Sequence, residues 1–217
     1  MSEAKKYVWY ASYGSNLNSE RFLCYINGGS PEGSTRVEEG CRDHSKPLDE
    51  ASFTIHYPLY FAKKATGWSN KGVAFIGLNQ DPDDITYSKK YLVTTEQFLD
   101  IVKQENGGIE FDIDLNEVKE KGSIHFRESW YGNILYLGED QGYPIFTFTA
   151  PWDRNEVDWE KPSHAYLTTI IKGLKSDFSS EVIYEYLRKK QGIKGYYTEE
   201  ELASVVYHIF RVSPPVE

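Results

Sequence analysis

Residues 7–17 read YVWYASYGSNL, an aromatic and β-branched run that passes directly into a glycine, a serine and an asparagine. The run predicts a first strand, and the Gly-Ser-Asn triplet predicts the turn by which the chain leaves it. Apolar side chains then recur at near-helical spacing up to Ile26, with Asn18 or Ser19 as the cap and Asn27-Gly28-Gly29 as the stop. The first unit is therefore predicted to be a strand, a glycine-containing loop and a helix.

The rest of the chain alternates predicted strands and helices. Strands are expected at 53–62, 73–78 and 85–93, and a hairpin of 130–137 with 143–149. Helices are expected after the caps Thr94, Ser163, Ser179 and Thr198. The segments 30–50 and 109–128 lack a clear apolar period and are predicted insertions. Mixed strands followed by helices indicate an α+β fold.

Composition limits the class of partner. The chain has 217 residues, of which 40% are hydrophobic, and a formal net charge of −9. This charge argues against nucleic acid or an anionic membrane surface as the main partner. No run approaches the roughly 18 apolar residues of a membrane span. Two cysteines and no apolar leader segment favour a reducing compartment, so a cytoplasmic location is expected.

The loop Tyr13-Gly14-Ser15-Asn16-Leu17 is a candidate anion site. A glycine between strand and helix allows a sharp turn that points several backbone N–H groups at one place. The start of a helix adds unsatisfied donors and a partial positive charge. Ser15 and Asn16 add side-chain donors. An ordinary strand-to-helix turn remains the alternative interpretation of this loop.

Glu105 is the candidate general base. It occupies the last turn of the helix that begins after Thr94, just before Asn106-Gly107-Gly108. The helix dipole disfavours a negative charge there and so favours proton uptake, which is the property that a base needs. An exposed surface glutamate is the alternative, because the dipole penalty is only about 0.3–1 kcal/mol.

No other motif predicts chemistry. Cys41 and His44 lie three residues apart, but two further ligands at suitable spacing would be needed for zinc, so no metal site is expected. The sequence contains no nucleophile elbow, Walker loop or dinucleotide fingerprint, and no cofactor is expected.

Several of these segments, taken in order, resemble the gamma-glutamylcyclotransferase-like family, which includes gamma-glutamylamine cyclotransferases and AIG2-like proteins. The resemblance rests on the 13–17 loop, on Gly72-Val73-Ala74-Phe75-Ile76, on Gln104-Glu105 closing a helix, and on Pro162 to Leu167 before a helix that contains Gly173. It covers roughly residues 7–175. The two insertions and the C-terminal part resemble a longer, poorly characterised bacterial branch.

The resemblance implies a small mixed β-barrel with flanking helices as domain 1–175, interrupted at 30–50 and 109–128. A C-terminal helical extension, 176–217, is expected to pack on the same domain. The implied enzyme is a cofactor-independent cyclotransferase of the acyltransferase or lyase type. It would release 5-oxoproline from a gamma-glutamyl amine or amino acid, with Glu105 as catalytic base.

The resemblance also implies the residues that bind this small-molecule substrate. They are the loop residues Tyr13, Gly14, Ser15, Asn16 and Leu17, with Tyr131 and Tyr166 in the pocket wall. Lys71 before Gly72 and phenylalanines at 146 and 148 depart from the family pattern. The two insertions and the C-terminal part could form a lid or reshape the pocket, so the leaving group stays open.

Other functions remain open at this stage. The same base could activate water or remove a gamma-glutamyl tag from a carrier or a modified amine. The cavity could instead bind an amino-acid-like ligand without turnover, or the C-terminal helices between Ser179 and Arg211 could bind another protein. The sequence does not define the oligomeric state.

Overall fold

The computed structural model describes residues 6–31 and 37–211. Three short stretches lie outside the described residues. They are the start of the predicted domain 1–175 (residues 1–5), part of the first predicted insertion (32–36) and the end of the predicted extension 176–217 (residues 212–217).

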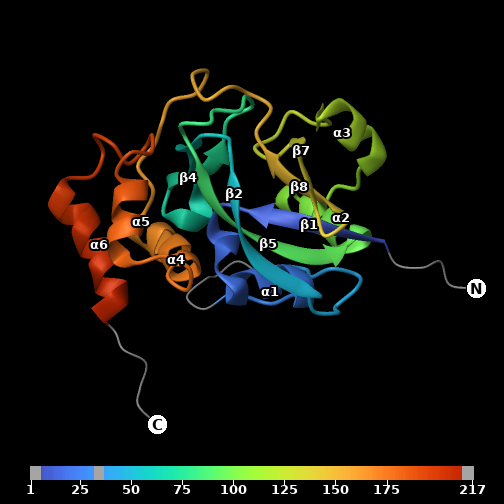
Figure 1. The fold of residues 1–217 in the computed structure, drawn as a ribbon, viewed down its shortest axis with the longest axis horizontal. Helices are drawn as coiled ribbons and strands as arrows, with labels where there is room; N and C mark the ends of the chain where they lie inside the picture. The colour runs from blue at the N-terminus through green and yellow to red at the C-terminus, as the bar shows by residue number, and fades with distance from the viewer. Residues whose placement is uncertain (1–5, 32–36, 212–217) are drawn as a thin grey trace, which may run out of the picture.

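The main sheet contains six strands in the order β2-β5-β1-β8-β7-β6. The central strand β1 (Tyr7–Ser12) is parallel to β8 (Tyr143–Thr149) and antiparallel to β5 (Thr86–Thr94), so the sheet is mixed. The remaining strands are β2 (Asp49–Ile55), β6 (Ser123–His125) and β7 (Asn133–Asp140). Figure 1 shows this sheet with helices around it, and the predicted α+β class is confirmed.

A second, two-stranded sheet pairs β3 (Leu59–Ala65) with β4 (Lys71–Ile76). The prediction of one strand over 53–62 was wrong, because β2 ends at Ile55 and β3 begins at Leu59. Pro58 lies in this break, where its missing N–H cannot continue a ladder. Its carbonyl instead accepts a hydrogen bond from the Gly77 amide at 2.9 Å.

Helices begin where the caps were predicted. Asn18, Thr94, Ser163 and Ser179 each accept a hydrogen bond from a backbone amide of the first turn that follows. The helices are α1 (Ser19–Asn27), α2 (Thr95–Glu105), α3 (Leu115–Lys121), α4 (His164–Leu174), α5 (Ser180–Leu187) and α6 (Glu199–Arg211), with the 3-10 turns η1 (Ser15–Leu17) and η2 (Thr66–Trp68).

The second insertion is more regular than its sequence indicated. It contains α3 and the edge strand β6, which pairs with β7. The hairpin formed by β7 and β8 starts at Asn133 rather than at 130. Its turn lies at Gln141-Gly142, both with positive φ, as a tight two-residue hairpin requires.

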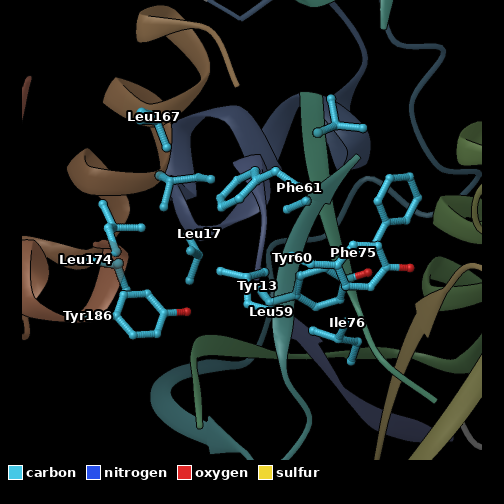
Figure 2. Close-up of a cluster of buried hydrophobic side chains, with 14 of the residues drawn as sticks. Tyr13, Leu17, Leu59, Tyr60, Phe61, Phe75, Ile76, Leu167, Leu174 and Tyr186 are labelled. Atoms are coloured by element: carbon cyan, nitrogen blue, oxygen red, sulfur yellow. The ribbon is translucent and has the colours of Figure 1, made fainter. Parts of the chain in front are cut away.

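The sheet buries both of its faces. Along β1, Trp9 and Ala11 belong to a core cluster shared with β3, β4 and α4, whereas Val8 and Tyr10 face a second cluster with α1 and α2. This alternation is the two-residue period of a strand covered on both sides. Figure 2 shows the first cluster, in which aromatic rings of β3 and β4 face side chains of α4 and α5.

The C-terminal helices join the first core cluster. Ile183 of α5 and Leu202 of α6 are buried in it. Tyr87 of β5 stacks on Phe178 with ring centroids 4.1 Å apart, and the Lys190 ammonium lies 2.6 Å from Asp84 Oδ1. No helix in the described part of the chain is both long and apolar enough to cross a membrane.

The contact between α4 and η1 depends on Gly173. A Cβ atom at this position would lie 2.3 Å from the carbonyl carbon of Leu17 and 2.6 Å from the amide nitrogen of Asn18. The absence of a side chain therefore allows α4 to touch the backbone that follows β1.

We expect Gly173→Ala to lower the free energy of unfolding by about 1–3 kcal/mol, because the added methyl group overpacks this contact. The loss would occur although alanine has the higher helix propensity, by about 1 kcal/mol. Urea denaturation measures the change. Gly67→Ala is the matched control, since no heavy atom lies within 4 Å of its added Cβ. A Gly173→Ala variant as stable as the control would contradict the packing argument.

Candidate active site

Three segments that are distant in the sequence meet beside the carboxyl end of β1. The chain leaves β1 at Ser12, turns at Gly14 into η1 and enters α1 after its cap Asn18. Glu105 is the last residue of α2, and Tyr166 lies in the first turn of α4.

Two adjoining cavities lie between these segments. The inner cavity, about 30 Å³, is lined by the 13–16 loop, Glu105, Tyr131 and Tyr166, among others. The site cavity, about 330 Å³, is lined by Ser15, Arg21, Trp68, Glu105, Tyr131 and Tyr166, together with neighbouring residues. Glu105 therefore lines the same space as the loop, and it is half-buried rather than fully exposed.

Gly14 allows Tyr166 to approach the loop. A Cβ atom on Gly14 would lie 3.0 Å from the Tyr166 hydroxyl oxygen. This oxygen accepts a hydrogen bond from the Ala74 amide at 3.1 Å. The hydrogen of the hydroxyl group is therefore available for donation to another group.

Tyrosines hold the Asn16 side chain and backbone in place. Asn16 Nδ2 donates to the Tyr10 hydroxyl at 3.4 Å, and the Tyr91 hydroxyl donates to the Asn16 carbonyl at 2.8 Å. Asn16 Oδ1 is buried without a hydrogen-bond partner among the described residues. An unsatisfied buried acceptor is costly, which makes this atom a candidate for pairing with a ligand N–H group.

Two residues of the 13–17 loop, Tyr13 and Leu17, make contacts that hold the fold together. The Tyr13 hydroxyl donates to the Phe148 carbonyl at 2.8 Å, so Tyr13 lines the inner cavity while it is fixed to β8. Leu17 is among the lining residues of neither cavity, and its side chain lies in the core cluster below α4. Its side chain thus contributes to the core, and the contact of Leu17 with the substrate stays a prediction.

Burial keeps the tyrosine hydroxyls of the site protonated. It raises the pKa of Tyr166 to about 12, against the opposing effect of the Ala74 amide. Burial is also the main cause of the raised pKa values of Tyr10 and Tyr131, with the Glu105 carboxylate contributing in the same direction. These three hydroxyl groups are therefore protonated near neutral pH, and the three tyrosines line the inner cavity together with Glu105.

Asn106 ties the end of α2 to the loop that carries Tyr131. Its Nδ2 donates to the carbonyl of Val102 at 2.9 Å and to that of Tyr131 at 3.1 Å. Its Oδ1 accepts from the Ser129 hydroxyl. Its own carbonyl accepts from Arg127 Nη1 at 2.8 Å. Asn106 thus positions Glu105 and Tyr131 together, although the sequence indicated only a helix stop.

Arg21 brings a positive charge to the site cavity. It lies on α1 with 7% of its surface exposed, and its guanidinium carbon is 5.1 Å from the centre of the Trp68 ring. Its Nη2 is 3.9 Å from Glu38 Oε1. In the sequence, Arg21 occurs at the spacing of the apolar side chains of this helix, which indicates only that it shares their face.

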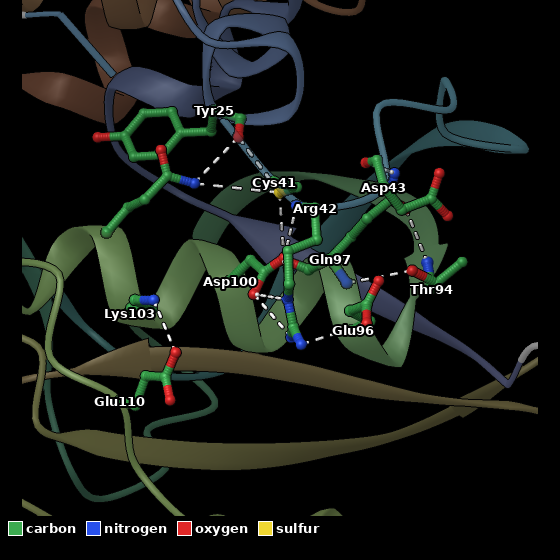
Figure 3. A network of polar contacts seen from close by, with 11 residues as sticks. Tyr25, Cys41, Arg42, Asp43, Thr94, Glu96, Gln97, Asp100, Lys103 and Glu110 are labelled. Carbon is green, nitrogen blue, oxygen red and sulfur yellow. Dashed lines mark hydrogen bonds and ion pairs between the residues drawn. The ribbon is translucent and has the colours of Figure 1, made fainter. Parts of the chain in front are cut away.

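The α2 helix is fixed to the preceding chain over its whole length. Figure 3 shows Arg42 paired with Asp100 and Glu96, and Gln97 beside the Thr94 cap. Gln104 Nε2 donates to the Tyr25 carbonyl at 3.0 Å, one residue before Glu105. These bonds hold the C-terminal end of α2 against α1, which favours a defined position for the Glu105 backbone.

Comparison with solved structures identifies the fold. An uncharacterized human protein has a TM-score of 0.51 at 16% identity, covering 94% of this chain and 99% of that chain. A gamma-glutamyl cyclotransferase has a TM-score of 0.50 at 15% identity, with the same coverage. The chain therefore has the gamma-glutamyl cyclotransferase fold.

The sequence matches no protein-family model. Histone deacetylase 5 of Arabidopsis thaliana is 38% identical over 188 residues, a match that covers 79% of this chain and 28% of that protein. The chain thus spans little more than a quarter of this relative. These comparisons do not confirm the bacterial branch or the AIG2-like assignment. No group of three or more potential metal ligands occurs among the residues that the structure describes.

We expect Asn106→Ala to lower the free energy of unfolding by about 1–3 kcal/mol, because it leaves buried partners of the amide group unpaired. Urea denaturation measures this loss. Asn116→Ala, at an exposed asparagine on α3, is the control and should stay within about 0.5 kcal/mol of the parent. Equal stabilities of the two variants would contradict the bridging role of Asn106.

The raised pKa of Tyr166 predicts a stability change at alkaline pH. The folded state holds this proton more tightly than the unfolded state, whose tyrosine pKa is about 10. The contribution of this proton to the free energy of unfolding is complete below pH 10 and is lost as the pH rises through about 12. Tyr166→Phe should therefore flatten the decline of unfolding free energy between these pH values by about 2–3 kcal/mol. Identical slopes for the variant and the parent in urea titrations would contradict this assignment.

Proposed function

We propose that the chain is a gamma-glutamylcyclotransferase-like enzyme that releases 5-oxoproline from a gamma-glutamyl amine or amino acid. One observation carries this proposal: Glu105 lines the same inner cavity as Gly14, Ser15 and Asn16. The carboxylate at the end of α2 thus faces the loop predicted to hold the substrate head group. The fold shared with a gamma-glutamyl cyclotransferase supports the same kind of reaction.

The reaction requires positioning and proton transfer but no protein nucleophile. The α-amine of the gamma-glutamyl group attacks the γ-carbonyl carbon and forms the ring C–N bond, while the bond from this carbon to the leaving nitrogen breaks. Two protons pass overall from the α-ammonium nitrogen to the leaving nitrogen, with Glu105 as the relay. No water or redox partner is consumed. Holding the two reacting atoms of one substrate together is the main contribution expected of the cavity.

The side chains around Glu105 suit the other groups of this substrate. Arg21 provides the positive charge that an α-carboxylate requires. Asn16 Oδ1 provides an acceptor for the α-amine. The Tyr166 hydroxyl, whose oxygen accepts from the Ala74 amide, can donate to the oxygen on which negative charge develops. The site cavity of about 330 Å³ is of the size expected for a small-molecule pocket.

A second candidate is a binding module for an amino-acid-like ligand in the same cavity. The match to histone deacetylase 5 favours this candidate. The matched segment accounts for 28% of that protein, so in that protein it is joined to other sequence. The activity in the name histone deacetylase belongs to that protein, and a match of this extent does not assign it to this chain.

We expect Glu105→Gln to lower kcat/KM for 5-oxoproline release by about 10²–10⁴-fold, because the neutral amide cannot accept the proton. The near-isosteric change should leave the urea midpoint almost unaltered. Glu120→Gln, an exposed glutamate on α3, is the control and should retain full activity. The assay measures 5-oxoproline from a panel of gamma-glutamyl amino acids, amines and glutathione.

The same variant separates the two candidates. An active Glu105→Gln protein would show that Glu105 is not the base. Thermal stabilisation by gamma-glutamyl compounds that persists in Glu105→Gln, with no 5-oxoproline formed by the parent, would favour the binding module.

A further inference from the structure

A large groove opens beside the site cavity. This outer groove has a volume of about 1140 Å³ and runs between α1, the η2 turn and α4. It shares Arg21, Ala65, Trp68 and Trp130 with the site cavity, so the two spaces adjoin. A free amino acid as leaving group would fill only a small part of it, since drug-sized ligands occupy pockets of about 300–1,000 Å³.

One face of α4 forms a wall of the groove. Ala165, Thr168, Thr169 and Lys172 line it at helical spacing, whereas the opposite face of the helix is buried in the core. On the other side lie the small residues Gly67 and Ser69 of the η2 region. Small and hydroxyl-bearing side chains leave room for an extended main chain and offer it hydrogen bonds.

The charge of the groove differs from that of the whole chain. The protein has a formal net charge of −9, but among the described residues the groove is lined by Arg21, Lys64 and Lys172 and by one carboxylate, that of Glu20. Arg21 also lies 3.9 Å from Glu38, so Lys64 and Lys172 supply most of the positive charge. Lys172 has no ion-pair partner among the described residues, and Lys64 has only a long contact, 3.6 Å, with Glu160. A local excess of positive charge on an acidic protein favours an anionic occupant.

From these observations we infer that the outer groove binds the leaving-group part of the substrate, and that this part is an extended acidic peptide. The inference rests on the proposed function, because it places the gamma-glutamyl head group in the site cavity. Trp68 and Trp130 lie at the junction, where the amide bond to be broken would pass between the two spaces. The peptide could carry the gamma-glutamyl group on its N-terminal amine or on a lysine side chain.

The test compares four substrates by 5-oxoproline release. They are gamma-glutamyl-alanine, an acidic octapeptide modified at its N-terminus, the same peptide modified at an internal lysine, and a basic counterpart. We expect kcat/KM for one or both acidic peptides to exceed that for the alanine and basic compounds by about tenfold. The two acidic substrates distinguish the two attachment sites.

Charge reversal of the groove provides the matched variant. Lys172→Glu should lower kcat/KM for the acidic peptides about fivefold and leave gamma-glutamyl-alanine unchanged. Lys175→Glu, at an exposed lysine near the same helix end that is not among the groove-lining residues, should alter neither. Added salt should weaken the preference for the acidic peptides.

The outcomes separate failure of the inference from failure of the proposed function. Turnover of gamma-glutamyl-alanine that equals or exceeds that of the acidic peptides, with no effect of Lys172→Glu, would overturn the inference and leave the function standing. Absence of 5-oxoproline from every compound would overturn the function. In that case, fluorescence anisotropy of the labelled acidic peptide tests binding to the groove. Lys172→Glu should weaken this binding, and Lys175→Glu should not. Absence of binding, or equal binding by the two variants, would overturn the inference as well.

Discussion

The site depends on a backbone-to-backbone contact between α4 and the 3-10 turn that follows β1. Gly173 permits this contact, since any side chain would overlap the Leu17 carbonyl. The same approach places the Tyr166 hydroxyl against Gly14 and the Ala74 amide. Two glycines far apart in the chain thus set the position of the loop relative to α4 and β4, and the cavity lies between these elements.

The second constraint acts at the end of α2. A carboxylate at a helix C-terminus is disfavoured by the helix dipole, so its position must be held by other contacts. Asn106 and Gln104, on either side of Glu105, bond to the Tyr131 loop and to α1. The second insertion therefore has a structural role at the site, because Arg127, near its end, and Ser129, just beyond it, bond to Asn106.

Electrostatics differ between the parts of the site. Around Glu105 the neutral hydroxyls of buried tyrosines can donate hydrogen bonds without adding charge. Arg21 lies at the boundary, where the site cavity meets a groove lined by two further lysines. The charged head group of the proposed substrate would lie near Arg21, and an anionic chain beyond it would lie near the two lysines.

The sequence by itself determined the α+β class and most helix starts. It also identified the two candidate features of the site, a glycine-containing loop after a strand and a glutamate at the end of a helix. These features are local: caps, turn residues and apolar periods act within a few residues. It did not predict the break at Pro58, the helix within 109–128, or the packing of Leu17 in the core. Only the tertiary structure decided that Arg21 borders the cavity, that Asn106 joins the end of α2 to the Tyr131 loop, and that a basic groove adjoins the site. Each of these depends on contacts between residues distant in the chain, which a local pattern does not encode.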